Sequence, residues 1–287
     1  MMHFNKIYVE IGNVCNLSCS FCPTLKREKR QMTPSEFGVV CHKIRPFTDY
    51  IYMHLMGEPL CHKSLEELFG IARSFGFRVC ITTNGTLLDK KGRLLLDFAD
   101  IIHKVSISLH CIEGNDIESR LADYMTTVTE FSRKAASCGI YTVLRLWNID
   151  TDEREGENSQ NEYIESRLKS DFPHVWKKRW NGFGIADHIF LEYAGIFTWP
   201  EESDAEPREK GYCHGLGDQI GILADGTVVP CCLDSEGHVA LGNIFSESLE
   251  DILKSERAEK IVNGFANGEM VEELCKKCSF AHRFSKR

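Results

Sequence analysis

Alternating segment lengths restrict this chain more than any other feature of its sequence. Short runs rich in β-branched and aromatic residues alternate with longer amphipathic stretches over about the first 195 residues. This alternation is typical of repeated βα units around a parallel sheet. The predicted strands are 6–12, 50–56, 77–82, 104–109, 140–146 and 187–193, and the predicted helices between them are 33–45, 64–75, 87–98 and 116–137. We therefore expect an α/β fold in which these βα units form a partial (β/α)6, TIM-like barrel.

Two further regions follow the fifth predicted strand. Residues 151–182 are polar and predict an insertion with one exposed helix before the sixth strand. Proline and acidic residues are concentrated at 199–210, which indicates a domain boundary. Beyond it, 219–223 and 227–230 flank a hairpin turn at 224–226, and 246–264 has a helical pattern. We predict two domains, a partial barrel at 1–198 and a small cysteine-rich α+β domain at 199–287.

Charge and hydropathy limit the possible partners. The 34 Lys and Arg residues against 42 Asp and Glu residues give a net charge of −8, which disfavours non-specific binding to nucleic acid or to an anionic membrane. No apolar run approaches the ~18 residues of a membrane span, and the first residues lack the features of a signal peptide. We expect a cytoplasmic protein without a membrane partner.

Thirteen cysteines are the most unusual count in the composition. In a reducing compartment, metal binding or catalysis explains such a number better than disulfides do. Seven of them form two spaced groups, Cys15, Cys19 and Cys22, and Cys213, Cys231, Cys275 and Cys278. The other six are scattered, and we expect them to be buried apolar residues: Cys41, Cys61, Cys80, Cys111, Cys138 and Cys232.

The first cysteine group lies in a loop directly after the first predicted strand. A structural zinc site needs four ligands, and no nearby cysteine or histidine supplies a fourth. Three thiolates can hold a four-iron cluster and leave one iron open to an exogenous ligand. The group therefore favours a reactive iron–sulfur cluster, with a zinc loop as the alternative.

The Cys15-x3-Cys19-x2-Cys22 spacing, with Phe21 before the last cysteine, resembles the hallmark motif of the radical S-adenosylmethionine (SAM) superfamily. The resemblance implies a 4Fe–4S cluster whose open iron is chelated by the amino and carboxylate groups of SAM. It implies reductive cleavage of the sulfonium C–S bond and hydrogen abstraction by a 5′-deoxyadenosyl radical. It also implies a flavodoxin- or ferredoxin-like electron donor. The protein would then position the reactants and exclude water.

Further motifs follow the predicted strands, where active sites of such folds gather. Met56-Gly57-Glu58-Pro59 resembles the family's Gly-Gly-Glu-Pro segment, which binds the SAM amino group. Met56 replaces the first glycine, at a position where the family's backbone approaches SAM closely.

The next three strands supply the other expected SAM contacts. Asn84 follows the third strand in a turn and suits a ribose hydroxyl. Ser106 and Ser108 share one face of the fourth strand and resemble family contacts to the SAM carboxylate or ribose. Arg145, at the end of the fifth strand, could pair bidentately with the carboxylate. Taken singly, such residues usually form an ordinary turn, a half-exposed strand or a surface salt bridge. Their joint placement after successive strands is what favours SAM binding.

Three more residues are candidates for handling a substrate proton. His110, Glu192 and Tyr193 lie near predicted strand ends, although ordinary residues also occupy such positions. The basic run 26–30 could approach an acidic substrate or a reductase, or form a solvated face.

The second cysteine group contains one Cys-x-x-Cys pair, whereas a zinc ribbon would contain two. The group resembles the SPASM/twitch extension of radical SAM enzymes, which implies one fully ligated auxiliary 4Fe–4S cluster. The spacing from Gly226 selects Cys231 over its neighbour Cys232. Such a cluster could transfer an electron or serve a structural role.

Together these features predict a radical SAM oxidoreductase that dehydrogenates or otherwise modifies a small-molecule or peptide substrate. Two alternatives remain open, a redox-neutral radical SAM enzyme with a structural auxiliary cluster and a non-catalytic iron–sulfur or zinc protein.

Overall fold

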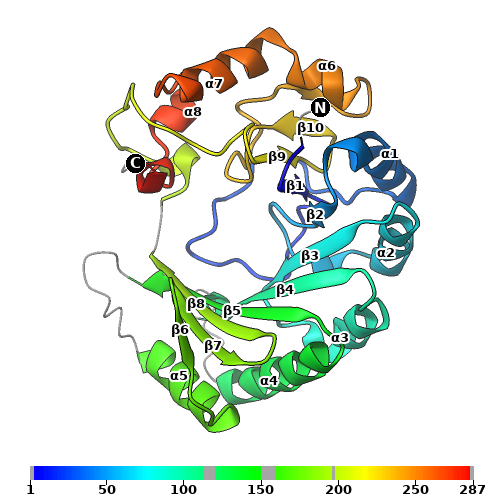
Figure 1. The fold of residues 1–287 in the computed structure, drawn as a ribbon, viewed down its shortest axis with the longest axis vertical. Coiled ribbons are helices and arrows are strands. Elements are labelled where there is room, and N and C mark those ends of the chain that lie inside the picture. Colours follow the sequence, from blue (N-terminus) through cyan, green and yellow to red (C-terminus); the bar gives the residue numbers. More distant parts are fainter. Residues whose placement is uncertain (1–2, 113–119, 150–158, 196–197, 285–287) are drawn as a thin grey trace. The chain divides into compact units, whose positions relative to one another are not determined.

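The computed structural model describes residues 3–112, 120–149, 159–195 and 198–284. The chain divides into two compact units, each of which combines segments that are distant in sequence (Figure 1). The first contains residues 1–14, 22–78 and 197–287, and the second contains residues 15–21 and 79–196.

The sheet of the first unit joins the beginning of the chain to its C-terminal part. Its strands have the order β11-β10-β9-β1-β2. Strand β1 pairs in parallel with both β2 and β9, whereas β10 is antiparallel to β9 and β11. The strand bounds are β1 Lys6–Val9, β2 Tyr50–Tyr52, β9 Gln219–Ile222, β10 Thr227–Val229 and β11 Gly242–Asn243. The hairpin predicted at 219–230 is therefore present, and it extends the sheet that begins with β1.

The helices of the first unit begin at residues that the sequence marks clearly. In α1, Thr33 and Glu36 form a capping box, and Pro34 occupies the first helical turn. The helix bounds are α1 Pro34–Ile44, α2 Leu65–Ser74, α6 Leu249–Leu253, α7 Glu256–Ala266 and α8 Glu273–Lys276. Short 3-10 helices cover Arg45–Phe47, Pro59–Cys61, Pro200–Glu202 and Ala281–Phe284.

The second unit contains a mostly parallel sheet with the strand order β3-β4-β5-β8-β7-β6. Its first four strands are parallel, and β7 and β6 continue it as an antiparallel hairpin. The strand bounds are β3 Arg78–Thr83, β4 Ile102–Ser108, β5 Tyr141–Ile149, β6 Lys177–Arg179, β7 Gly182–Ala186 and β8 Ile189–Gly195. The helix bounds are α3 Leu88–Asp97, α4 Leu121–Ser137 and α5 Ser159–Asp171, and a 3-10 helix covers Leu109–Cys111.

The sequence pattern predicted most of these elements. The six expected strands correspond to β1, β2, β3, β4, β5 and β8, and the four expected helices correspond to α1, α2, α3 and α4. The predicted residues 116–119 of the last helix and 151–158 of the insertion lie outside the described residues. The mostly parallel arrangement confirms the α/β fold class. None of the helices within the described ranges has both the length and the apolar character needed to cross a membrane.

Three expectations need correction. Cys138, which we expected to be buried, is exposed at the C-terminal end of α4, and Cys61 and Cys232 are only partly buried. The helix predicted at 246–264 is two helices, because Ser255 caps the N-terminus of α7 with its side chain while Lys254 ends α6. The insertion contains the β6–β7 hairpin in addition to helix α5. Its strands were missed because β6 consists of three charged residues and β7 contains two glycines, so neither has the apolar alternation that identifies a strand.

Candidate active site and iron–sulfur sites

The loop that carries Cys15 and Cys19 is held by the turn after β3. Asn84 Nδ2 donates a hydrogen bond to Asn16 Oδ1 at 3.0 Å and lies 3.9 Å from Cys15 Sγ. Asn16 Nδ2 donates to Thr86 Oγ1 at 2.9 Å, and the Leu17 amide lies 3.4 Å from Cys15 Sγ. Amide donors near a cysteine sulfur stabilise a metal-bound thiolate and tune an iron–sulfur cluster.

Asn84 is itself buried and fixed. Its carbonyl accepts hydrogen bonds from the Tyr124 hydroxyl at 2.9 Å and from Cys111 Sγ at 3.2 Å. The next residue, Gly85, has a φ of +77°, which favours glycine. The structure thus places the Asn84 side chain against the cysteine loop.

The Phe21 ring packs on His110, with the ring centroids 5.0 Å apart. His110 Nδ1 lies 3.2 Å from the Arg145 carbonyl and 3.3 Å from the Trp147 amide. Burial lowers the pKa of His110 to about 4. The hydrogen bond with the Arg145 carbonyl raises this pKa by less than burial lowers it, and the Arg145 charge lowers it further. His110 is therefore neutral near pH 7 and connects the cysteine loop to β5.

The polar residues predicted on β4 and β5 share one face of the sheet. Ser108 is aligned with Arg145, and Ser106 lies two residues earlier on β4. The buried Ser106 hydroxyl has no hydrogen-bond partner among the described residues. The Arg145 guanidinium lies 4.4 Å from the Trp147 ring centroid and 3.4 Å from Thr82 Oγ1. A hydroxyl and a guanidinium in this arrangement fit a ligand carboxylate or ribose.

The two candidates on β8 face opposite ways. Glu192 is aligned with Arg145 and shares its face, whereas Tyr193 is aligned with Leu146. The Tyr193 hydroxyl donates to Glu165 on α5 at 2.8 Å. Burial, followed by the Glu165 charge, raises the pKa of Tyr193. The structure therefore brings Glu192, and not Tyr193, to the face that carries Arg145 and Ser108.

Gly57 and Glu58 lie in the first unit. Gly57 has a φ of +77°, and a Cβ there would lie 2.5 Å from the Gly12 carbonyl oxygen. Glu58 is buried, its amide donates to the Val14 carbonyl at 3.0 Å, and its Oε1 accepts from the Leu60 amide at 3.0 Å. Gly57 and Glu58 thus lie against the segment that leads into the first cysteine group.

The presence of Met56, where the motif that this segment resembles has a glycine, has a packing explanation. Met56 is buried in a small apolar cluster that includes Tyr8, Leu55, Leu223 and Val229. The close backbone approach in this segment occurs at Gly57, so the methionine side chain at the preceding position fills space without disturbing it.

The four cysteines of the second group line one largely apolar pocket. Its other lining residues are Pro200, Leu233, Leu274 and Ala281. Burial raises the pKa of all four thiols, and for Cys231 and Cys275 the neighbouring cysteines raise it further. Four thiolates gathered in apolar surroundings need a positively charged partner, which an iron–sulfur cluster would provide. The donor set therefore fits such a cluster.

Cys232 has different surroundings from Cys231. It packs against the cluster around Tyr8 and Met56, and burial raises its pKa to about 11. Cys231 lines the pocket with the other three cysteines. This arrangement supports the choice of Cys231 as the ligand.

A buried ion pair was missed by the sequence analysis. Glu10, at 0% exposure, accepts two hydrogen bonds from Arg27 at 3.0 and 2.7 Å and one from the Ala224 amide at 2.9 Å. In the same basic run, Arg30 pairs with Glu36 at 2.6 Å. The run is therefore not simply a solvated face, because two of its arginines stabilise the first unit. The only sign of this ion pair in the sequence is an acidic residue, Glu10, directly after an apolar strand.

Two family models match the chain. The radical SAM superfamily model matches residues 9–146, and SPASM, an iron–sulfur cluster-binding domain, matches residues 213–279.

Curated relatives match over shorter stretches. The S-adenosyl-L-methionine-dependent 2-deoxy-scyllo-inosamine dehydrogenase of Niallia circulans is 30% identical over 95 residues, which are 31% of this chain and 38% of that enzyme. The GTP 3′,8-cyclase of Chlorobaculum tepidum is 33% identical over 125 residues, which are 39% of this chain and 35% of that enzyme. The matched part is thus little more than a third of either enzyme.

Solved structures match over nearly the whole chain. BtrN in complex with AdoMet and 2-DOIA is 18% identical, with a TM-score of 0.61, and the match covers 97% of this chain and 94% of that one. Streptococcus suis SuiB bound to S-adenosylmethionine is 14% identical, with a TM-score of 0.63, and the match covers 98% and 74%. At these identities the likeness establishes the fold.

Proposed function

We propose that this chain, a radical SAM superfamily member that carries a SPASM domain, reductively cleaves SAM and abstracts a hydrogen atom from its substrate. The observation that carries the proposal is the Cys15-x3-Cys19-x2-Cys22 loop, which meets amide donors from Asn84 and Leu17 at its first cysteine.

A radical SAM domain binds a 4Fe–4S cluster and SAM, and a SPASM domain binds auxiliary iron–sulfur clusters. When bound, the first cluster and SAM supply the electron and the 5′-deoxyadenosyl radical for hydrogen abstraction. In our proposal the three cysteines of the first group hold that cluster. Glu58 and Gly57 receive the SAM amino group, and Ser106, Ser108 and Arg145 orient its carboxylate and ribose.

The second cysteine group would hold an auxiliary cluster, which supplies a one-electron acceptor. We propose that the net reaction is therefore an oxidation. The relative named as a dehydrogenase supports oxidation of a small molecule, and the peptide-bound SuiB structure supports a peptide as the alternative substrate. We further propose a flavodoxin- or ferredoxin-like electron donor, a cytoplasmic location, and a boundary between domains 1–198 and 199–287.

The test is production of 5′-deoxyadenosine from SAM by anaerobically reconstituted protein with dithionite as reductant. Cys19→Ala should abolish the product. Cys138→Ala is the matched control, because Cys138 is exposed at the end of α4 and belongs to neither group. Equal yields from wild type and Cys19→Ala would refute the assignment.

A further inference from the structure

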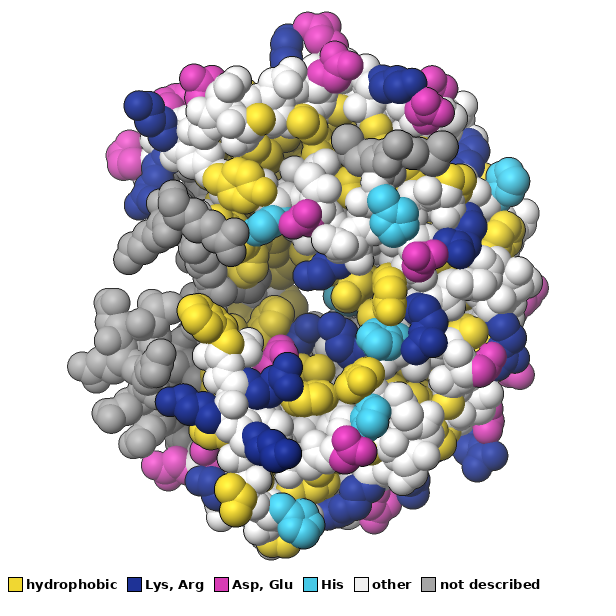
Figure 2. Space-filling view, viewed as in Figure 1, with side chains coloured by type: hydrophobic (Ala, Val, Ile, Leu, Met, Phe, Trp, Pro, Cys, Tyr) yellow, Lys and Arg dark blue, Asp and Glu magenta, His cyan; other side chains and the backbone are white. Residues whose placement is uncertain are grey.

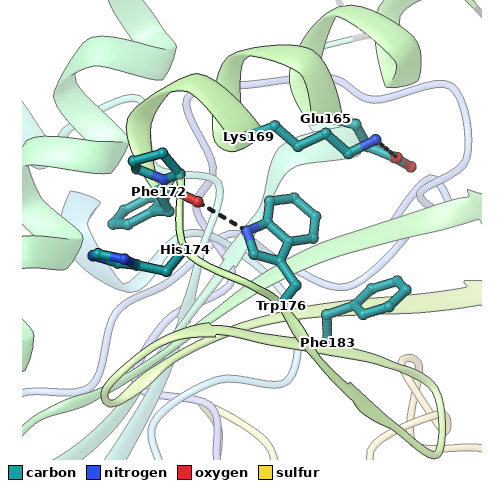
Figure 3. A pocket seen from close by; sticks show the side chains of 7 residues that line it. Glu165, Lys169, Phe172, His174, Trp176 and Phe183 are labelled. Atoms are coloured by element: carbon teal, nitrogen blue, oxygen red, sulfur yellow. Dashed lines mark hydrogen bonds and ion pairs between the residues drawn. The ribbon is translucent and has the colours of Figure 1, made fainter.

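The proposed function does not involve the pocket on the insertion between β5 and β8. This pocket has a volume of about 360 Å³ and lies between α5 and the β6–β7 hairpin. Figure 3 shows the indole of Trp176 among the surrounding side chains, with Phe172 and Phe183 on different sides of it. The volume is near the lower limit for ligand pockets and suits one large side chain.

Three polar side chains of this pocket, those of Trp176, Glu165 and Lys169, already have partners within the chain. Trp176 Nε1 donates to the Phe172 carbonyl at 3.0 Å. The Glu165 carboxylate accepts from Tyr193 at 2.8 Å and lies 3.8 Å from Lys169 Nζ. What the pocket offers an incoming group is therefore aromatic surface, mainly from Trp176 and Phe183, whose ring centroids are 5.8 Å apart.

The charge beside the pocket is opposite in sign to that of the whole chain. Residues 172–186 contain Lys177, Lys178 and Arg179 but no Asp or Glu, whereas the chain has a net charge of −8. All three basic residues are exposed, and Figure 2 shows Lys and Arg side chains gathered over β6, β7 and β8. Such a patch attracts an acidic partner and repels a basic one.

Strand β6 also has an available edge. It pairs with β7 on one side, and none of the strands within the described ranges pairs with its other side. Lysines on an edge can simply prevent aggregation. However, Val175 and Trp180, just before and just after β6, are 92% and 100% exposed, and exposed large apolar residues beside an open edge are typical of an interaction site.

We propose that the outer edge of β6 and the Trp176 pocket form a docking site for an extended acidic peptide segment. The segment would add a strand beside Lys177–Arg179 and place its acidic side chains against Lys177 and Arg179, which share one face of the strand. On the opposite face, where Lys178 is aligned with Phe183, it would insert one large apolar side chain into the pocket. This site is separate from SAM chemistry, so its test does not depend on the proposed function.

The experiment uses full-length holoprotein and a fluorescein-labelled peptide in which glutamate alternates with valine around one central phenylalanine. Fluorescence anisotropy should give a Kd of roughly 10–100 µM. Peptides with lysine in place of glutamate, or with a central serine, should bind at least about tenfold more weakly. Hydrogen exchange should slow at amides 177–184 when the acidic peptide binds.

Variants at exposed positions separate docking from folding. The double variant Lys177→Glu, Arg179→Glu should weaken binding at least about tenfold, because both side chains lie on the face that receives the glutamates, and Trp180→Ser should weaken it several-fold. The double variant Lys63→Glu, Lys90→Glu makes the same change in net charge at exposed positions elsewhere and should bind like wild type. All variants should keep the circular-dichroism spectrum and the thermal unfolding midpoint of wild type.

Several results would overturn the proposal. They are failure of the acidic peptide to bind, equal binding of the lysine peptide, unchanged binding by the double variant at β6, or no exchange protection at 177–184. Displacement by poly(U) RNA together with equal binding of the serine peptide would instead indicate a general polyanion surface.

Discussion

The centroids of the Phe21 and His110 rings lie 5.0 Å apart, so the cysteine loop packs on a histidine in the 3-10 helix that follows β4. Because Nδ1 of the same histidine contacts the backbone of Arg145 and Trp147, one side chain supports both the loop and the strand that carries the predicted SAM-binding arginine.

The lowered pKa of His110, about 4, predicts a specific dependence of stability on pH. The unfolded chain binds this proton below about pH 6.5 while the folded chain does not, so stability falls as pH drops from about 6.5 toward 4. The contribution lost between pH 7.5 and 5.5 is about 1 kcal/mol. Anaerobic urea unfolding at both pH values should show this loss reduced in His110→Gln.

His42→Gln provides the control for this measurement, because it removes an exposed histidine on α1. A His110→Gln protein whose stability changes with pH as much as wild type would show that His110 is not the group responsible.

Gly57→Ala should be strongly destabilising. A Cβ would lie 2.5 Å from the Gly12 carbonyl oxygen, and the φ of +77° is itself unfavourable for alanine. The backbone conformation alone costs about 1 kcal/mol, and the clash with fixed backbone adds about 1–3 kcal/mol. The midpoint temperature of thermal unfolding and the iron content per chain should both decrease.

Gly76→Ala isolates the contribution of the clash. Gly76 has a φ of +72° but no heavy atom within 4 Å of the position of a Cβ. Equal losses of stability in the two variants would mean that the contact between Gly57 and Gly12 has no energetic effect.

Breaking the buried pair between Glu10 and Arg27 should cost about 3–5 kcal/mol, because Arg27→Met leaves a fully buried carboxylate without its cation. Chemical denaturation of the anaerobic protein measures the loss. Arg93→Met removes an exposed partner of Asp97 and should cost less than about 1 kcal/mol. Similar costs for the two substitutions would contradict the burial argument.

The choice between adjacent cysteines can be tested by iron analysis. Cys231→Ala should reduce the iron content from about eight to about four per chain, because a four-iron cluster would lose a ligand. Cys232→Ala should retain about eight irons, since that residue packs in the cluster around Tyr8. The reverse result would assign the ligand to Cys232.

Most of the scaffold could be predicted because its signals are local. The capping box at Thr33 and the apolar runs of β3, β4 and β5 are each contained within a few residues. The β6–β7 hairpin could not be predicted, because its strands are stabilised by pairing with β8 and not by their own composition.

The candidate site shows the same contrast. The two cysteine groups were visible as spacings, and the structure gathers the second group around one pocket. The contacts of Asn84 with Asn16 and of Glu10 with Arg27 depend on the fold, so neither has a signature in the sequence. Glu192 and Tyr193 point to opposite faces because they are adjacent on a strand, but which of them shares the face of Arg145 follows from register, which neighbouring strands determine.

The parallel pairing of β1 with β9 has a consequence during synthesis. Residues 6–9 are aligned with 219–222, so one edge of β1 stays without its partner until more than 200 further residues have been made. Such long-range pairing slows folding and leaves an edge open to aggregation in the meantime. A shortened chain that ends before residue 219 would keep this edge open permanently. We therefore expect the N-terminal region to aggregate when it is expressed alone.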